Sequence, residues 1–93
     1  MYERVYSRRF NTSLRKTLRS KRVTYDDIEK AISAIASGKP LDRKHRDHAL
    51  KGDFKGYREC HIKPDVLLIY KIEKDVLILV LADIGSHTNL FGI

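Results

Sequence analysis

The chain has 93 residues, which is enough for one compact domain and too few for two, so we expect a single domain spanning residues 1–93. Its hydrophobic content of 42% excludes a disordered tail, and no apolar run is long enough to cross a bilayer. The net charge of +7 lies in the first half: residues 1–50 contain 13 Lys and Arg against 6 Asp and Glu, whereas residues 51–93 contain 6 of each.

Residues 3–6 are predicted to form a short strand, after which Ser7 can cap a helix by accepting a hydrogen bond from its first turn. Phe10, Leu14 and Leu18 follow at intervals of four residues and predict one apolar helix face. The other faces are basic, because residues 8–22 contain seven Lys and Arg and no acid. Such a segment is typical of a surface that binds phosphates or an acidic protein.

A second helix is predicted to begin at Thr24, where Asp27 takes the place of the usual Glu in a capping box. Its apolar face is formed by Ile28, Ala31, Ile32, Ile35 and Ala36. Gly38 and Pro40 are expected to end it, since glycine accepts a left-handed backbone and proline lacks an amide hydrogen.

The second half is predicted to be a polar loop over residues 41–52 followed by strands over 55–62, 66–72 and 76–83. Short turns join these strands, so they should form an antiparallel meander. The predicted fold class is therefore α+β: an N-terminal strand, two helices, then a three-stranded meander, in one sheet with both helices packed on one face.

Four side chains in or beside this half could carry acid–base chemistry, namely His48, His61, Asp65 and His87. Imidazole exchanges protons near neutral pH, so a basic protein with several of them is equipped to cut RNA without a metal. We expect His87 to be the general acid. Asp65, His48 or His61 would supply the base, although Asp65 follows a proline and is also typical of turn chemistry.

Neighbouring residues suit RNA binding: Lys51, Lys55 and Arg58 could contact phosphates, and Phe91 could stack on a base or close the core. We expect no cofactor. Zinc is disfavoured because the histidine spacings form no compact ligand pair and Cys60 is the only cysteine. That single cysteine, together with first residues that lack an apolar signal core, predicts a cytoplasmic location.

The order of elements over nearly the whole chain and a dense set of motifs from Asp47 to Phe91 match one known family. The matching segments are Asp47-His48-x-Leu50-x-Gly52, Lys55-Gly56-Tyr57-Arg58-Glu59-x-His61-x-x-Pro64-Asp65, Leu68-x-Tyr70 and Gly85-Ser86-His87-x-x-Leu90-Phe91. They resemble the YafQ-like toxins of the RelE/ParE superfamily. Two positions depart from the family pattern, with Val66 where tryptophan is common and Asp83 where arginine is common.

The resemblance implies a type II toxin that cleaves mRNA as a metal-independent and typically ribosome-dependent endoribonuclease, or mRNA interferase. It places the catalytic positions at His48, His61, Asp65, His87 and Phe91. Its partners would be mRNA, the ribosome and an acidic antitoxin, and no membrane is expected among them. The antitoxin would bind the basic N-terminal half and form a hetero-oligomer with the toxin. The alternatives are a ParE-like inhibitor of gyrase and a weakly active member that acts through antitoxin binding and operon repression.

Overall fold

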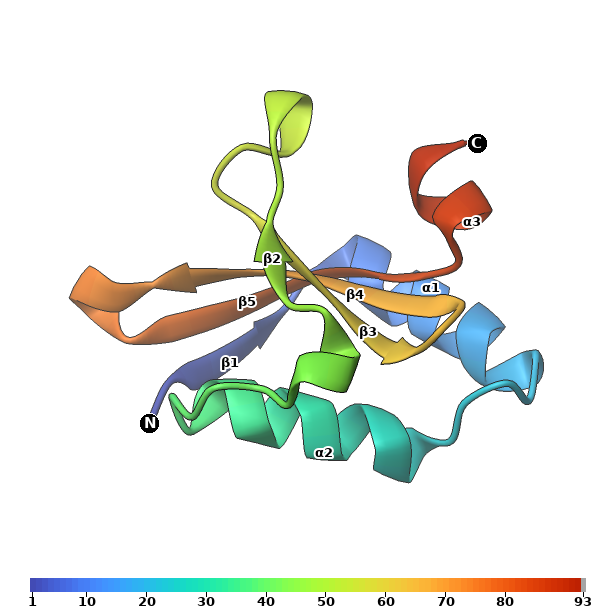
Figure 1. Ribbon diagram of the computed structural model, residues 1–93, viewed down its shortest axis with the longest axis horizontal. Coiled ribbons are helices and arrows are strands. Elements are labelled where there is room, and N and C mark those ends of the chain that lie inside the picture. The colour runs from blue at the N-terminus through green and yellow to red at the C-terminus, as the bar shows by residue number, and fades with distance from the viewer. Residues whose placement is uncertain (93) are drawn as a thin grey trace.

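The computed structural model describes residues 1–92, which form one mixed sheet of five strands with helices around it (Figure 1). The strands are β1 Glu3–Tyr6, β2 His48–Ala49, β3 Arg58–Lys63, β4 Val66–Glu73 and β5 Ile78–Gly85. The helices are α1 Arg8–Arg19, α2 Tyr25–Ala36 and α3 His87–Phe91, with short 3-10 helices η1 Arg43–His45, η2 Gly52–Phe54 and η3 Lys74–Val76. The sheet order is β1-β5-β4-β3-β2; β1 is parallel to β5 and the other neighbours are antiparallel.

The α+β class and the single sheet confirm the prediction, but the order of elements differs in detail. The prediction of a continuous loop over residues 41–52 was wrong, because this segment contains η1, the two-residue strand β2 and the start of η2. The meander therefore carries an additional edge strand. The last strand begins two residues later than predicted, since residues 74–76 form η3 and Leu77 takes a left-handed backbone with φ 55°. No described helix has the length and apolar character needed to span a membrane.

Both long helices begin where their caps predict. The Ser7 hydroxyl accepts a hydrogen bond from the Phe10 amide at 2.9 Å, and Thr24 and Asp27 form a complete capping box. Gly38 has φ 80°, the left-handed conformation that ends α2 at little steric cost.

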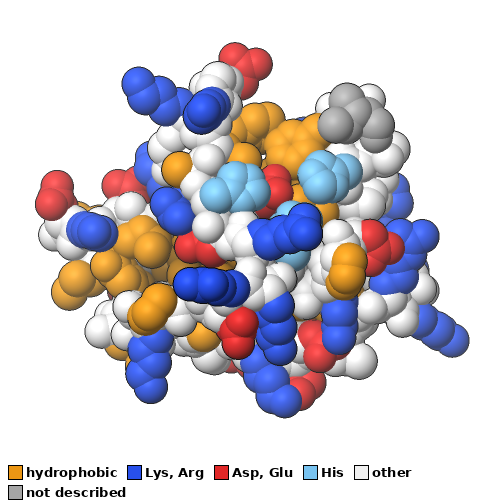
Figure 2. All heavy atoms as spheres, in the orientation of Figure 1, with side chains coloured by type: hydrophobic (Ala, Val, Ile, Leu, Met, Phe, Trp, Pro, Cys, Tyr) orange, Lys and Arg blue, Asp and Glu red, His pale blue; other side chains and the backbone are white. Residues whose placement is uncertain are grey.

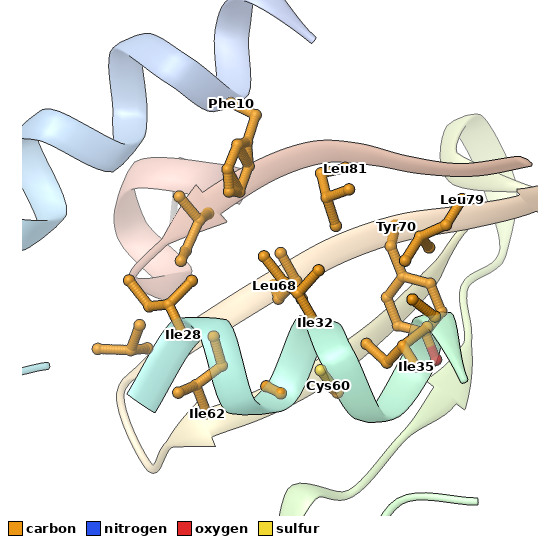
Figure 3. Packing of buried hydrophobic residues seen from close by; sticks show 14 of the residues in the cluster. Phe10, Ile28, Ile32, Ile35, Cys60, Ile62, Leu68, Tyr70, Leu79 and Leu81 are labelled. Carbon is orange, nitrogen blue, oxygen red and sulfur yellow. The ribbon is translucent and has the colours of Figure 1, made fainter. Parts of the chain in front are cut away.

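The core lies between the helices α1 and α2 and the face of the sheet that they cover. Figure 3 shows Phe10 from α1 and the isoleucines of α2 pointing at side chains of the central strands. The largest fully buried residues are Phe10, Ile28, Leu67, Leu68, Leu79, Leu81, Ile84 and Cys60, and all of them except Leu67 belong to this core. Burial raises the pKa of the Cys60 thiol to about 12, so this cysteine stays neutral and serves packing.

The second face of the sheet carries Glu59, His61 and Asp83. Cross-strand pairing aligns Glu59 with Ile69 and Asp83, and His61 with Leu67 and Gly85. Side chains of paired residues point to the same face, so these residues share the side opposite the core. In Figure 1, η2 and α3 lie on this side and α2 lies on the other.

An ion pair between β1 and α2 makes the stability of the fold depend on pH. Arg4 donates two hydrogen bonds of 2.8 Å to Glu29, and these bonds, together with one from Ser33, lower the pKa of Glu29 from 4.5 to about 2. A carboxyl group whose pKa is lower in the folded state stabilises the fold at any pH above its pKa in the unfolded state. This stabilisation is lost as the pH falls to the pKa of the folded state.

We therefore expect Glu29→Gln to lower the free energy of unfolding at pH 7 by about 1 kcal/mol, a modest amount because solvent screens a partly exposed pair. The difference from wild type should shrink as pH falls from 4.5 to about 2. Urea titrations at both ends of this range measure it. A difference that stays constant with pH would show that the carboxylate charge contributes nothing.

Candidate functional site

Two histidines share one carboxylate on the second face of the sheet. His48 on β2 is the cross-strand partner of Glu59 on β3, and His61 lies two residues further along the same strand. The distance from Nε2 to Glu59 Oε1 is 3.7 Å for His48 and 3.5 Å for His61. Glu59 is only 4% exposed, and acidic residues are rarely buried unless they are paired with another polar group.

The backbone fixes which ring nitrogen of each histidine carries hydrogen. Nδ1 of His48 lies 2.7 Å from the carbonyl oxygen of Arg46, and Nδ1 of His61 lies 3.2 Å from that of Pro64. A carbonyl only accepts, so each Nδ1 donates and the neutral ring leaves Nε2 free to accept a proton. Once protonated, both Nε2 atoms would face the Glu59 carboxylate, which stabilises an imidazolium.

His87 approaches this group from α3. Its ring centre is 6.0 Å from that of His61 and 5.9 Å from that of Phe91, and Phe91 packs edge-on against Phe54 of η2 at 5.3 Å. The Ser86 hydroxyl caps α3 by accepting from the Asn89 amide at 3.2 Å, which sets where His87 begins the helix. The rings of His61, His87, Phe91 and Phe54 therefore lie one against the next.

The surface around this group is basic. Figure 2 shows histidine side chains near the centre of one face, with hydrophobic side chains beside them and Lys and Arg around them. Lys51 and Lys55 flank η2 and are exposed, and neither makes an ion pair within residues 1–92.

Asp65 lies apart from the imidazoles. It occupies the turn between β3 and β4 and pairs with Arg22 at 2.8 Å, with both side chains more than half exposed. Within the described chain its carboxylate makes no hydrogen bond or ion pair to a histidine. The neighbouring Pro64 nevertheless supplies the carbonyl that orients His61, so this turn is connected to the site.

Arg58 points to the core side of the sheet. It donates to both carboxylate oxygens of Asp47 at 3.3 and 3.2 Å, and the hydroxyl of Tyr70 donates to the same carboxylate. The bond to Asp47 raises the pKa of Arg58, and burial raises the pKa of Tyr70. This network anchors the residue before His48, so it holds β2 in place.

Two acidic residues of this face were not among the predicted site residues. Strand alternation predicts that Glu59 shares a face with His61 and can hydrogen-bond to it, although Glu59 is not assigned a catalytic or binding role on that basis. Asp83 is opposite Ile69 on β5, with its side chain 15% exposed and its carboxylate 3.9 Å from Nε of Arg9. Among residues 1–92, no group of three His, Cys, Asp or Glu side chains is arranged to hold a metal ion.

Comparison with known proteins agrees on one family. The sequence profile of the family described as "Bacterial toxin of type II toxin-antitoxin system, YafQ" matches residues 2–92. The mRNA interferase toxin YafQ of Escherichia coli K12 is 43% identical over 53 residues, which cover 57% of this chain. The match spans about half of that relative, or 55% of its length.

Solved structures match over nearly the whole chain. A metal-bound toxin from Helicobacter pylori is 38% identical with a TM-score of 0.89, covering 98% of this chain and all of that one (100%). The toxin in the E. coli DinJ-YafQ complex is 28% identical with a TM-score of 0.84, covering 99% of this chain and 100% of that one.

Proposed function

This chain belongs to the YafQ family of type II toxin–antitoxin toxins, and we propose that it is an endoribonuclease that cleaves mRNA and so arrests translation. The observation that supports this most is the pairing of two Nε2 atoms with one buried carboxylate, with a third imidazole 6.0 Å from the nearer ring. A base and an acid on opposite sides of a phosphate are what RNA cleavage requires.

In the proposed reaction, Nε2 of His48 or His61 takes the proton of the ribose 2′-hydroxyl. The distances of 3.7 and 3.5 Å to Glu59 leave each Nε2 outside a close hydrogen bond, so a hydroxyl can approach it. The 2′-oxygen then attacks phosphorus. Glu59, whose carboxylate lies near the same Nε2 atoms, stabilises by its negative charge the imidazolium that has formed.

Protonated His87 completes the reaction by giving its proton to the departing 5′-oxygen. The bond from phosphorus to that oxygen breaks, so one product ends in a 2′,3′-cyclic phosphate and the other in a 5′-hydroxyl. Lys51 and Lys55 neutralise phosphate charge, and the ring of Phe91, backed by Phe54, stacks on a base. This scheme uses no metal.

Asp65 and Arg58 take supporting roles in this proposal. Asp65 holds the β3–β4 turn through Arg22 and thereby positions the Pro64 carbonyl that orients His61. Arg58 is engaged by Asp47, so it supports β2 and is less available to a phosphate than the two lysines. We further propose that cleavage takes place on the ribosome, where the basic first half can contact RNA phosphates.

Mapping of cellular message ends tests this function against the gyrase alternative. Primer extension after induction should show new 5′ ends within translated messages, while supercoiling by purified gyrase stays unchanged. Inhibited supercoiling without new message ends would favour a ParE-like toxin.

Asp83 supports one further candidate, a weakly active toxin that acts through its antitoxin. A carboxylate on the catalytic face repels phosphate, and Arg9 at 3.9 Å offsets it only partly. If this candidate holds, cleavage should rise when Asp83 is replaced by arginine. A variant no faster than wild type removes the support for it.

We propose that an acidic antitoxin binds the basic face of α1. The solved complex of the E. coli relative with DinJ supports an antitoxin partner. Arg15, Lys16 and Arg19 are exposed on α1 and make no ion pair within the described residues. They are therefore free to meet carboxylates.

Replacing Arg15, Lys16 and Arg19 together with serine should weaken antitoxin binding about tenfold or more and reduce its dependence on salt. Isothermal titration at several salt concentrations measures both. A matched control replaces Lys39, Arg43 and Lys74, three exposed cations outside α1, with serine. Equal effects in the two triple variants would show that overall charge, and not this helix, attracts the antitoxin.

A further inference from the structure

A cavity lined in part by His61 lies between α2, η1 and the end of β3. It has a volume of about 770 Å³, within the range of small-molecule and nucleotide sites. Its basic lining residues are Lys30, Lys44, His45, Arg46, His61 and Lys63. We call it the η1 groove. Figure 2 shows Lys and Arg side chains over this part of the molecule.

The η1 groove carries excess positive charge. Asp27 is the only acid among its described lining residues, and that carboxylate already faces Lys63 at 3.7 Å and accepts from the Thr24 amide at 3.0 Å. Lys44 and Arg46 are exposed and make no ion pair within residues 1–92. The two cations on η1 and its cap are thus available to an anion.

The groove is connected to the histidine cluster through the segment that contains η1. Nδ1 of His45 donates to the backbone oxygen of His61 at 2.7 Å, so η1 is fixed to the strand that carries a proposed base. The backbone oxygen of Arg46 accepts from His48 at 2.7 Å. Arg46 holds a left-handed backbone with φ 47°, a conformation that bulky residues seldom adopt. One short segment therefore lines the groove and orients the cluster.

We propose that the η1 groove binds a nucleotide of RNA that flanks the cleaved bond. Lys44 and Arg46 contact its phosphate, and the apolar part of the lining receives its base. That part consists of Ala31, Ala34, Leu41, Ile62 and Pro64. A site for single-stranded RNA combines cationic residues, which bind the phosphate, with an apolar surface, which packs against the base. The proposal rests on the proposed nuclease function, because it names where that substrate continues.

Binding of uncleavable RNA of two lengths tests the proposal. The probes are a 2′-O-methyl dinucleotide and a 2′-O-methyl octanucleotide, which lack the attacking hydroxyl. In Lys44→Gln and Arg46→Gln, the dissociation constant of the octanucleotide should rise about tenfold relative to that of the dinucleotide. The slope of log affinity against log salt should fall by about 0.7 for each lost phosphate contact.

Lys74→Gln is the matched control, because Lys74 is an exposed cation on η3 and does not line the groove. A length-dependent loss at Lys44 and Arg46 but not at Lys74 supports the proposal. No loss, or the same loss in all three variants, overturns it. Loss of antitoxin affinity with RNA affinity intact also overturns it and assigns the groove to an acidic protein.

Cleavage of unmethylated RNA by the wild-type protein separates the two proposals. Cleavage without the length-dependent loss rejects the groove alone. The length-dependent loss without any cleavage rejects the nuclease and leaves the groove as an RNA-binding site.

Discussion

Replacing His87 with alanine should lower RNA cleavage by about 10²- to 10⁴-fold, the usual contribution of a general acid, and relieve growth arrest on induction. His87 is the imidazole that approaches from α3, and its ring lies edge-on to that of His61 with 6.0 Å between the ring centres, so the two rings can contact one phosphate together. Cleavage rates of purified protein on a defined message measure the effect.

Asn89→Ala is the control for His87→Ala, because Asn89 is exposed on the same helix and contributes only its backbone amide to the cap. Both variants should keep the melting temperature of wild type, and only His87→Ala should lose activity. Undiminished cleavage and toxicity in His87→Ala would remove His87 from the mechanism.

Replacing Glu59 with glutamine should reduce kcat by about 10²-fold, since the carboxylate that stabilises the imidazolium is lost while the side-chain volume is kept. Its Oε1 lies 3.5 and 3.7 Å from the two proposed bases. KM should change little, because Glu59 is buried and does not contact a phosphate.

Stability distinguishes a functional role for Glu59 from a structural one. A buried carboxylate is costly, and neutralising it should leave the free energy of unfolding unchanged or raise it. Lower activity with equal or higher stability is the expected pattern in Glu59→Gln. Loss of stability in parallel with activity would mean that Glu59 only maintains the fold.

Local patterns predicted the long elements of this fold and missed the short ones. Ser7 and Thr24 mark the starts of α1 and α2 because caps are local signals that a few residues supply. The strand β2 has two residues and α3 has five, too few for a period of two or 3.6 residues to show. Both elements depend on contacts with the sheet.

In the site, too, local patterns predicted positions along one strand but not contacts between distant segments. Alternation along β3 predicts that Glu59 and His61 share a face, and that Arg58 points to the other, as observed. The position of His48 on this face depends on the pairing of β2 with β3. The ion pair of Asp65 with Arg22 depends on a contact between residues 43 positions apart. Neither contact is encoded in neighbouring residues.

Chemical identification of the RNA ends made by the purified protein bears on the whole mechanism. With free message in EDTA and ribosome-bound message in Mg²⁺, wild type should leave 2′,3′-cyclic phosphate and 5′-hydroxyl ends, because imidazoles alone move the protons. Intact RNA in both samples, or 3′-hydroxyl ends in either, would contradict the mechanism proposed for His48, His61 and His87.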